Sequence, residues 1–119
     1  RIGERTNIQD LSLVHESYQT FPTIVGNDVT VGHSVILHAC QVGNFSLIGM
    51  GSQLLDGSEI GDFVLLGAGS LVTEGMKIPS YSKAFGRPAK VVGKLSDQEI
   101  ERLKWSAKHY VQLAQSYLK

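Results

Sequence analysis

Three histidines in the first third of the chain have the residue type and spacing of a metal site. His33 and His38 lie five residues apart, and His15 lies twenty-three residues before His38. Neutral imidazole nitrogen binds Zn²⁺ at ~2.0–2.1 Å and also suits Co²⁺ and Fe²⁺. Three such ligands leave a fourth position open, as in catalytic rather than structural zinc sites. The histidines therefore indicate metal-assisted chemistry, provided that the fold brings them together.

A six-residue repeat must position these side chains, because aliphatic residues recur at every sixth position. This period fits neither an amphipathic helix nor a simple alternating strand, but it is typical of a triangular solenoid in which each short strand contributes one inward residue. A β-sandwich with glycine-rich turns is the alternative, but its spacing would not stay in phase for so long. The inward positions are Ile2, Ile8, Val14, Val25, Val31, Leu37, Val42, Ile48, Leu54, Ile60, Leu66, Val72 and Ile78.

The corners of this solenoid are expected at glycines. Four glycines follow inward aliphatic residues directly, and glycine accepts a positive φ without a Cβ penalty. We therefore expect the chain to turn at Gly43, Gly49, Gly61 and Gly67.

The sequence predicts one domain with two parts. Residues 1–79 form the repeat, with about eighteen residues in each coil, and residues 80–119 form an exit segment and a C-terminal α-helix. The chain begins at Arg1 already in repeat phase, so we expect further N-terminal coils ahead of it. Tyr81–Val92 is expected to be irregular. Ser96 and Glu99 then form a capping box before a helix of about twenty residues, whose apolar stripe is expected to pack along the solenoid or across a subunit boundary.

Two irregularities interrupt the repeat beside the histidines. One is a five-residue step from Leu37 to Val42, and the other is the segment 16–22, which we expect to leave the solenoid as a loop. One coil plus that loop separates His15 from His38, so the two imidazoles should stack one interstrand spacing apart, ~4.7–4.9 Å. His33 should lie of the order of 15 Å from His38 along extended chain and cannot join the pair within one chain. In a threefold assembly, His33 of one chain can face the pair of the next.

These residues resemble the γ-carbonic anhydrase family of hexapeptide-repeat proteins, over the whole length of the chain. The segments that carry the resemblance are Asn7-Ile8-Gln9-Asp10, Val14-His15, Val31-Gly32-His33, Leu37-His38-Ala39-Cys40 and Ile48-Gly49-Met50-Gly51. The resemblance implies an all-β solenoid, a left-handed parallel β-helix, with a C-terminal α-helix. It also implies a homotrimer with metal sites between subunits, in which His15 and His38 come from one chain and His33 from its neighbour.

The same resemblance implies the reversible hydration of carbon dioxide to bicarbonate, with Zn²⁺, or else Fe²⁺ or Co²⁺, as the metal. A bound Zn²⁺ lowers the pKa of its water to ~7, which makes hydroxide available at neutral pH. In this family Gln9 would hydrogen-bond the metal-bound water or bicarbonate, Asp10 would pair with an arginine of a preceding coil, and Asn7 would line the pocket. The family's proton-shuttle glutamate has no counterpart at the expected position, since the segment 16–22 carries only Glu16.

Two other functions are compatible with the repeat. One is an acyltransferase that uses His33 or His38 as a general base and binds a thioester cofactor between subunits. The other is a non-catalytic trimer that binds metal or serves in an assembly. The acyltransferase gives no purpose to Gln9, Asp10 and His15, whereas the non-catalytic metal-binding trimer is compatible with all three.

The composition indicates which binding partners and which cellular compartment to expect. Eleven basic and eleven acidic residues balance, so no nucleic-acid or anionic-membrane partner is expected. The apolar runs are far shorter than the ~20 residues that span a bilayer. Cys40 is the single cysteine and is expected to pack as a small apolar side chain rather than bind metal. A chain without disulfides suits a reducing compartment, so the cytoplasm is the expected location.

Overall fold

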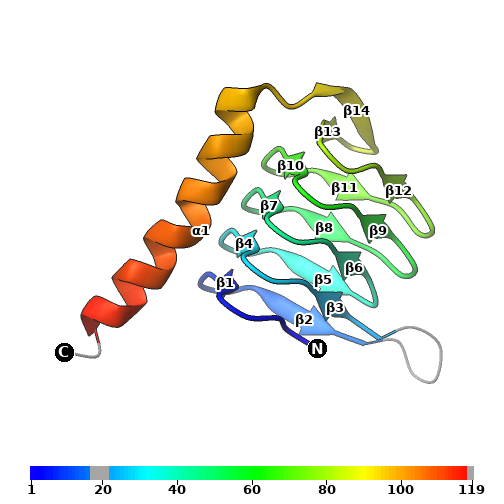
Figure 1. Cartoon of the computed structure of the whole chain (residues 1–119). Helices are drawn as coiled ribbons and strands as arrows, with labels where there is room; N and C mark the ends of the chain where they lie inside the picture. The colour runs from blue at the N-terminus through cyan, green and yellow to red at the C-terminus, as the bar shows by residue number, and fades with distance from the viewer. Residues whose placement is uncertain (17–21, 118–119) are drawn as a thin grey trace.

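The computed structural model describes residues 1–16 and 22–117, and it shows a parallel β-solenoid flanked by one long helix (Figure 1). The loop expected over residues 16–22 lies mostly outside the described residues. The solenoid strands are β1 (Asn7–Ile8), β2 (Leu13–His15), β3 (Ile24–Val25), β4 (Thr30–Val31), β5 (Ile36–His38), β6 (Gln41–Val42), β7 (Leu47–Ile48), β8 (Gln53–Leu54), β9 (Glu59–Ile60), β10 (Leu65–Leu66), β11 (Leu71–Val72) and β12 (Lys77–Ile78).

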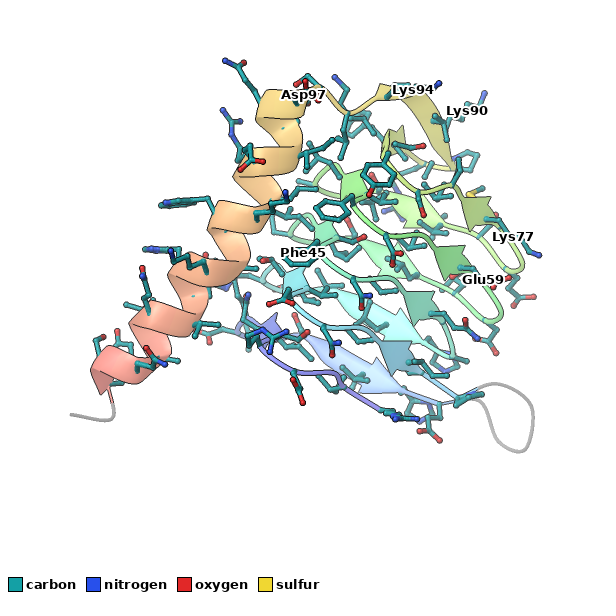
Figure 2. The ribbon with its side chains drawn as sticks, viewed as in Figure 1. Phe45, Glu59, Lys77, Lys90, Lys94 and Asp97 are labelled. Atoms are coloured by element: carbon teal, nitrogen blue, oxygen red, sulfur yellow. The ribbon has the colours of Figure 1, made fainter. Side chains whose placement is uncertain are left out.

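Each solenoid strand pairs with the strand one coil away, which produces three parallel sheets. One sheet runs β1-β4-β7-β10, a second β2-β5-β8-β11 and a third β3-β6-β9-β12. From β1 the chain passes along the rear sheet, which contains β2 and is drawn fainter, to β3. It then returns on the nearer side to β4, so the coil is left-handed (Figure 1). On the side away from the helix, Glu59 and Lys77 face each other across β9 and β12 at 3.4 Å (Figure 2). The predicted solenoid is confirmed.

The repeat positions form the core. Leu37, Ile48, Leu54 and Leu66 are fully buried, and they form two stacks, Leu37 with Leu54 in one sheet and Ile48 with Leu66 in another. The first coil differs, because β1 and β2 pair on one side only. Its three repeat residues stay 36–43% exposed, namely Ile2, Ile8 and Val14.

The glycines after the inward residues have a different purpose from the one expected. A Cβ on Gly43 would lie 2.5 Å from the carbonyl carbon of Gly61 on the next coil, and the other three are as crowded. Positive φ occurs elsewhere, at Gly51 and Gly57 among others. The expectation of positive φ at Gly43, Gly49, Gly61 and Gly67 was therefore wrong. The first three are required by close approach of the backbone of the next coil, and Gly67 by the ring of Phe85.

Side-chain ladders along the corners join the coils. The side-chain oxygen of Asn44 accepts the backbone N–H of Asn27 at 2.8 Å, and that of Asp62 accepts the N–H of Asn44 at 2.7 Å. Beside them, the ring of Phe45 stacks on that of Phe63 at 4.9 Å, and Phe63 stacks on Tyr81 at 5.1 Å. Amide and carboxylate thus serve the same purpose in the polar ladder.

The exit segment is regular, contrary to the expectation for Tyr81–Val92. β13 (Ser82–Gly86) continues the first sheet in parallel beside β10, and β14 (Ala89–Lys94) folds back on it as an antiparallel hairpin. Ser82 and Ala84 point inward, as the repeat residues do, and so cover the last coil.

The helix α1 (Asp97–Tyr117) begins at the predicted capping box and runs back along the solenoid toward β1 (Figure 1). The Glu99 carboxylate accepts the Ser96 N–H at 2.9 Å, and the Ser96 hydroxyl accepts the Glu99 N–H at 3.2 Å. Leu103 and Ala107 are buried, which confirms packing along the solenoid for the first half of the stripe. No helix in the described part of the chain is long and apolar enough to cross a membrane.

Replacing Gly43 with Ala should lower the free energy of unfolding by ~1–3 kcal/mol, because the added methyl overlaps the backbone of Gly61. Urea unfolding measures the loss. Gly93→Ala is the matched control, because a Cβ there meets only the end of the Lys83 side chain at 3.6 Å. Equal unfolding midpoints for the two variants would contradict the close-approach explanation.

Candidate metal centre

His15 and His38 stack at one edge of the solenoid. His15 ends β2, His38 ends β5, and the two are register partners in the parallel pair. Their ring centroids lie 4.8 Å apart, with 13° between the ring planes. The separation is the interstrand spacing predicted from counting one coil plus a loop. The predicted stacking is confirmed.

A buried threonine fixes the backbone behind both rings. The Thr23 hydroxyl donates to the carbonyl oxygen of His15 and accepts the N–H of Ala39 at 2.9 Å. The Ala39 N–H also lies 2.8 Å from the His15 carbonyl oxygen. Thr23 is fully buried, so the chain after each histidine is held from inside the solenoid. Thr23 was not predicted, since its partners are backbone groups.

A carboxylate orients the His38 ring. Nδ1 of His38 is hydrogen-bonded to Oδ1 of Asp56, which stands eighteen residues later, on the next coil. Both side chains are partly buried, with 35% and 27% of their surfaces exposed. This contact directs Nε2 away from Asp56. Asp56 was not predicted, since Leu37 pairs with Leu54 and Asp56 lies one residue beyond the position in register with His38.

His33 belongs to a different surface. It is exposed and lines a groove with Asn7, Gln9 and Asp10 from the first coil, opposite apolar and aromatic residues of α1, including Tyr110. Among the residues that the structure describes, no three His, Cys, Asp or Glu side chains are grouped closely enough to hold a metal ion. The candidate ligands therefore divide into a pair and a separate third residue, as expected.

A polar chain connects the groove to the helix. The Gln9 side-chain amide donates to Oδ1 of Asn7 at 3.2 Å, and the Asn7 amide reaches Oγ1 of Thr30 at 3.3 Å. Thr30 in turn shares a 3.3 Å hydrogen bond with the buried Ser106 of α1. The structure thus brings Asn7 and Gln9 together, and the contributions of Thr30 and Ser106 were not predicted.

The partner of Asp10 stays a prediction. Its side chain lines the groove, while its carbonyl oxygen accepts the Ser34 N–H at 2.9 Å. Arg5, the arginine of the same coil, is bound to Asp28 through two hydrogen bonds of 2.8 and 3.0 Å.

His15 and His38 supply part of the ligand set that a divalent metal ion requires. Two parallel imidazoles, one of them held by a carboxylate through its second nitrogen, are typical of protein zinc ligands. A third ligand must come from outside this pair. Cys40 is a poor donor, because it is fully buried and burial raises the pKa of its thiol to about 12. The pair thus offers two nitrogen ligands, and His33 lies on a different surface of the same chain.

The chain has relatives among known proteins. No model of a protein family matches it. It is 44% identical over 119 residues to "Gamma carbonic anhydrase 2, mitochondrial" of Arabidopsis thaliana, an alignment that spans 96% of this chain and 43% of the relative. It is 48% identical over 115 residues to "Probable carbonic anhydrase" of Methanocaldococcus jannaschii, across 97% of this chain and 72% of the relative.

A solved structure from Bacillus cereus, described as a putative acetyltransferase, superposes with a TM-score of 0.92 at 49% identity. The match covers 95% of this chain and 65% of that one. The chain thus spans less than half of the plant relative and about two thirds of the B. cereus protein.

Iodoacetamide should alkylate Cys40 in the folded protein at pH 8 at least ~100-fold more slowly than in urea. Below its raised pKa the thiol keeps its proton, and only the thiolate reacts, so reactivity is lost in the folded state and regained on unfolding. Mass spectrometry follows the labelling. Equal rates in the two states would contradict the burial of this thiol.

Proposed function

The chain belongs to the γ-carbonic anhydrase family of hexapeptide-repeat proteins, and on that premise we propose that it catalyses the reversible hydration of carbon dioxide to bicarbonate. The reaction takes place at a metal site shared between two copies of the chain. The observation that carries this proposal is the stacked pair of His15 and His38, which supplies two oriented imidazoles, with no third metal ligand grouped with them among the described residues.

The assembly is a homotrimer in which each interface contains one site. His15 and His38 come from one subunit, and His33 from its neighbour completes the set. The exposure of His33, away from the pair, supports this division, because an exposed histidine at a corner is available to an adjacent chain. Three identical solenoids packed side by side repeat the same contact three times and close the ring.

A divalent ion, Zn²⁺ or else Fe²⁺ or Co²⁺, supplies Lewis acidity that lowers the pKa of water toward neutrality. The protein holds this ion through three neutral imidazoles. The parallel stacking of His15 and His38 limits ring rotation, and Nδ1 of His38 is hydrogen-bonded to Asp56.

Gln9 and Asn7 position the reacting oxygens. One Gln9 N–H is used by Asn7, which leaves a second N–H and the carbonyl oxygen for water or bicarbonate. Asn7 is itself held by Thr30, so the Gln9 side chain is supported by a chain of hydrogen bonds that reaches α1. Asp10 adds the one carboxylate among the described lining residues of this groove. Ile8 and Leu113 give it apolar walls that suit carbon dioxide.

An acetyltransferase is the second candidate function, supported by the B. cereus structure and by the pairing of His38 with Asp56. A histidine oriented by a carboxylate is also the arrangement of a general base. This function gives His15 no purpose, whereas a metal site uses both stacked rings.

Purified protein should contain metal, sediment at three times the 12.9 kDa chain mass, and hydrate carbon dioxide in stopped-flow assays. His33→Ala should lose the tightly bound metal, and hydration should fall at least ~100-fold, because a zinc site depends on its full ligand set. His109→Ala is the matched control, since His109 stacks on Trp105 of α1 at 4.7 Å and should leave both properties unchanged.

Two results would contradict the proposal. One is a metal-loaded trimer without hydration activity that consumes acetyl-coenzyme A, which would favour the acetyltransferase. The other is a monomer that retains stoichiometric metal, which would exclude a site between chains.

A further inference from the structure

The contact between His38 and Asp56 depends on a difference in length between two successive coils. Leu37 pairs with Leu54 before the corner, and the Gly57 N–H donates to the Ala39 carbonyl oxygen at 2.8 Å after it. Between these two fixed points the lower coil has one residue, His38, and the upper coil has two. The second of the two is Asp56.

The additional residue places a carboxylate above an imidazole. The upper coil turns immediately after Asp56, at Gly57, which has a φ of +73°. The Asp56 side chain reaches down to Nδ1 of His38 at this turn. The five-residue step from Leu37 to Val42 is thus the feature that brings the two groups together, since a six-residue step would oppose equal numbers of residues.

We infer that Asp56 is a positioning residue that holds hydrogen on Nδ1 of His38 and thereby presents Nε2 as the metal ligand. The inference rests on the proposed function, because it takes His38 to bind a metal ion. A carboxylate accepts hydrogen bonds and cannot donate them, so its partner nitrogen must carry the hydrogen. The other ring nitrogen then has a free lone pair. Carboxylates beside metal-binding histidines act in this way in many proteins.

Stacking makes this orientation effective. The His38 ring lies parallel to the His15 ring at 4.8 Å, so rotation about the Cβ–Cγ bond is restricted on that side. Asp56 restricts it at Nδ1. Together, the two neighbours fix both the plane of the ring and its tautomer before any ion binds.

The first test uses the metal-free protein and requires no variant. Two-bond ¹H–¹⁵N NMR correlations distinguish the tautomers of a neutral imidazole. His38 should be present as the Nδ1–H form, whereas free histidine prefers the Nε2–H form. An Nε2–H tautomer at His38 would overturn the inference.

The second test measures the Co²⁺ dissociation constant of the assembled protein against a competing chelator, with the visible Co²⁺ spectrum as the signal. Asp56→Asn should raise this constant ~10–100-fold, the usual effect of removing a carboxylate beside a ligating histidine. It should also alter the spectrum of the ion that still binds, which a purely structural role would not do.

Asp62→Asn is the matched control, because it makes the same chemical change on the same solenoid. Asp62 accepts a backbone N–H in the corner ladder, where Asn44 already does so with an amide oxygen. This variant should bind Co²⁺ as the wild type does. All three metal-free proteins should melt at the same temperature.

The outcomes separate the two proposals. If the wild type binds Co²⁺ and Asp56→Asn binds it equally well, or if Asp62→Asn weakens binding as much, the role of Asp56 is refuted and the proposed function stands. If the folded wild-type assembly binds no Co²⁺, the proposed function fails, and the ligand role of His38 fails with it.

Discussion

The hydrogen-bonded distance between successive coils determines which side chains meet in this protein. Parallel strands lie ~4.7–4.9 Å apart, so any two residues one coil apart are brought to that separation. The stacked rings of His15 and His38 at 4.8 Å and of Phe45 and Phe63 at 4.9 Å both follow from it. The same distance leaves no space for a Cβ at Gly43. A site built on such a scaffold takes its geometry from the backbone.

The six-residue phase predicted the strands, the core and the stacking of His15 on His38, because all three depend only on counting along the chain. What counting could not give was the backbone conformation at each corner. Gly43 was expected to have a positive φ, whereas the structure requires glycine there for lack of space. The hairpin of β13 and β14 was missed because the predicted repeat ended at Ile78 and Tyr81–Val92 was expected to be irregular. In fact Ala84 continues the inward pattern.

The residues that support the candidate site were harder to predict than the candidate ligands. Asp56 reaches His38 only because adjacent coils differ by one residue, and the five-residue step that reveals this difference does not show which side chain meets the histidine. Thr23 acts on backbone groups, which leave no signal in side-chain spacing. Ser106 contacts Thr30 from seventy-six residues away, through the docking of α1. The capping box at Ser96 and the burial of Leu103 hold the helix that makes this contact.

Mixed oligomers can show whether the ligands of one proposed site come from two chains. One variant carries His33→Ala, and the other carries His15→Ala with His38→Ala. Each alone should hold only background metal. Refolded together, they should recover up to one tightly bound metal per mixed trimer, because one interface then joins an intact His33 to an intact pair. Mixed trimers that are verified by mass and stay at background metal would contradict the account.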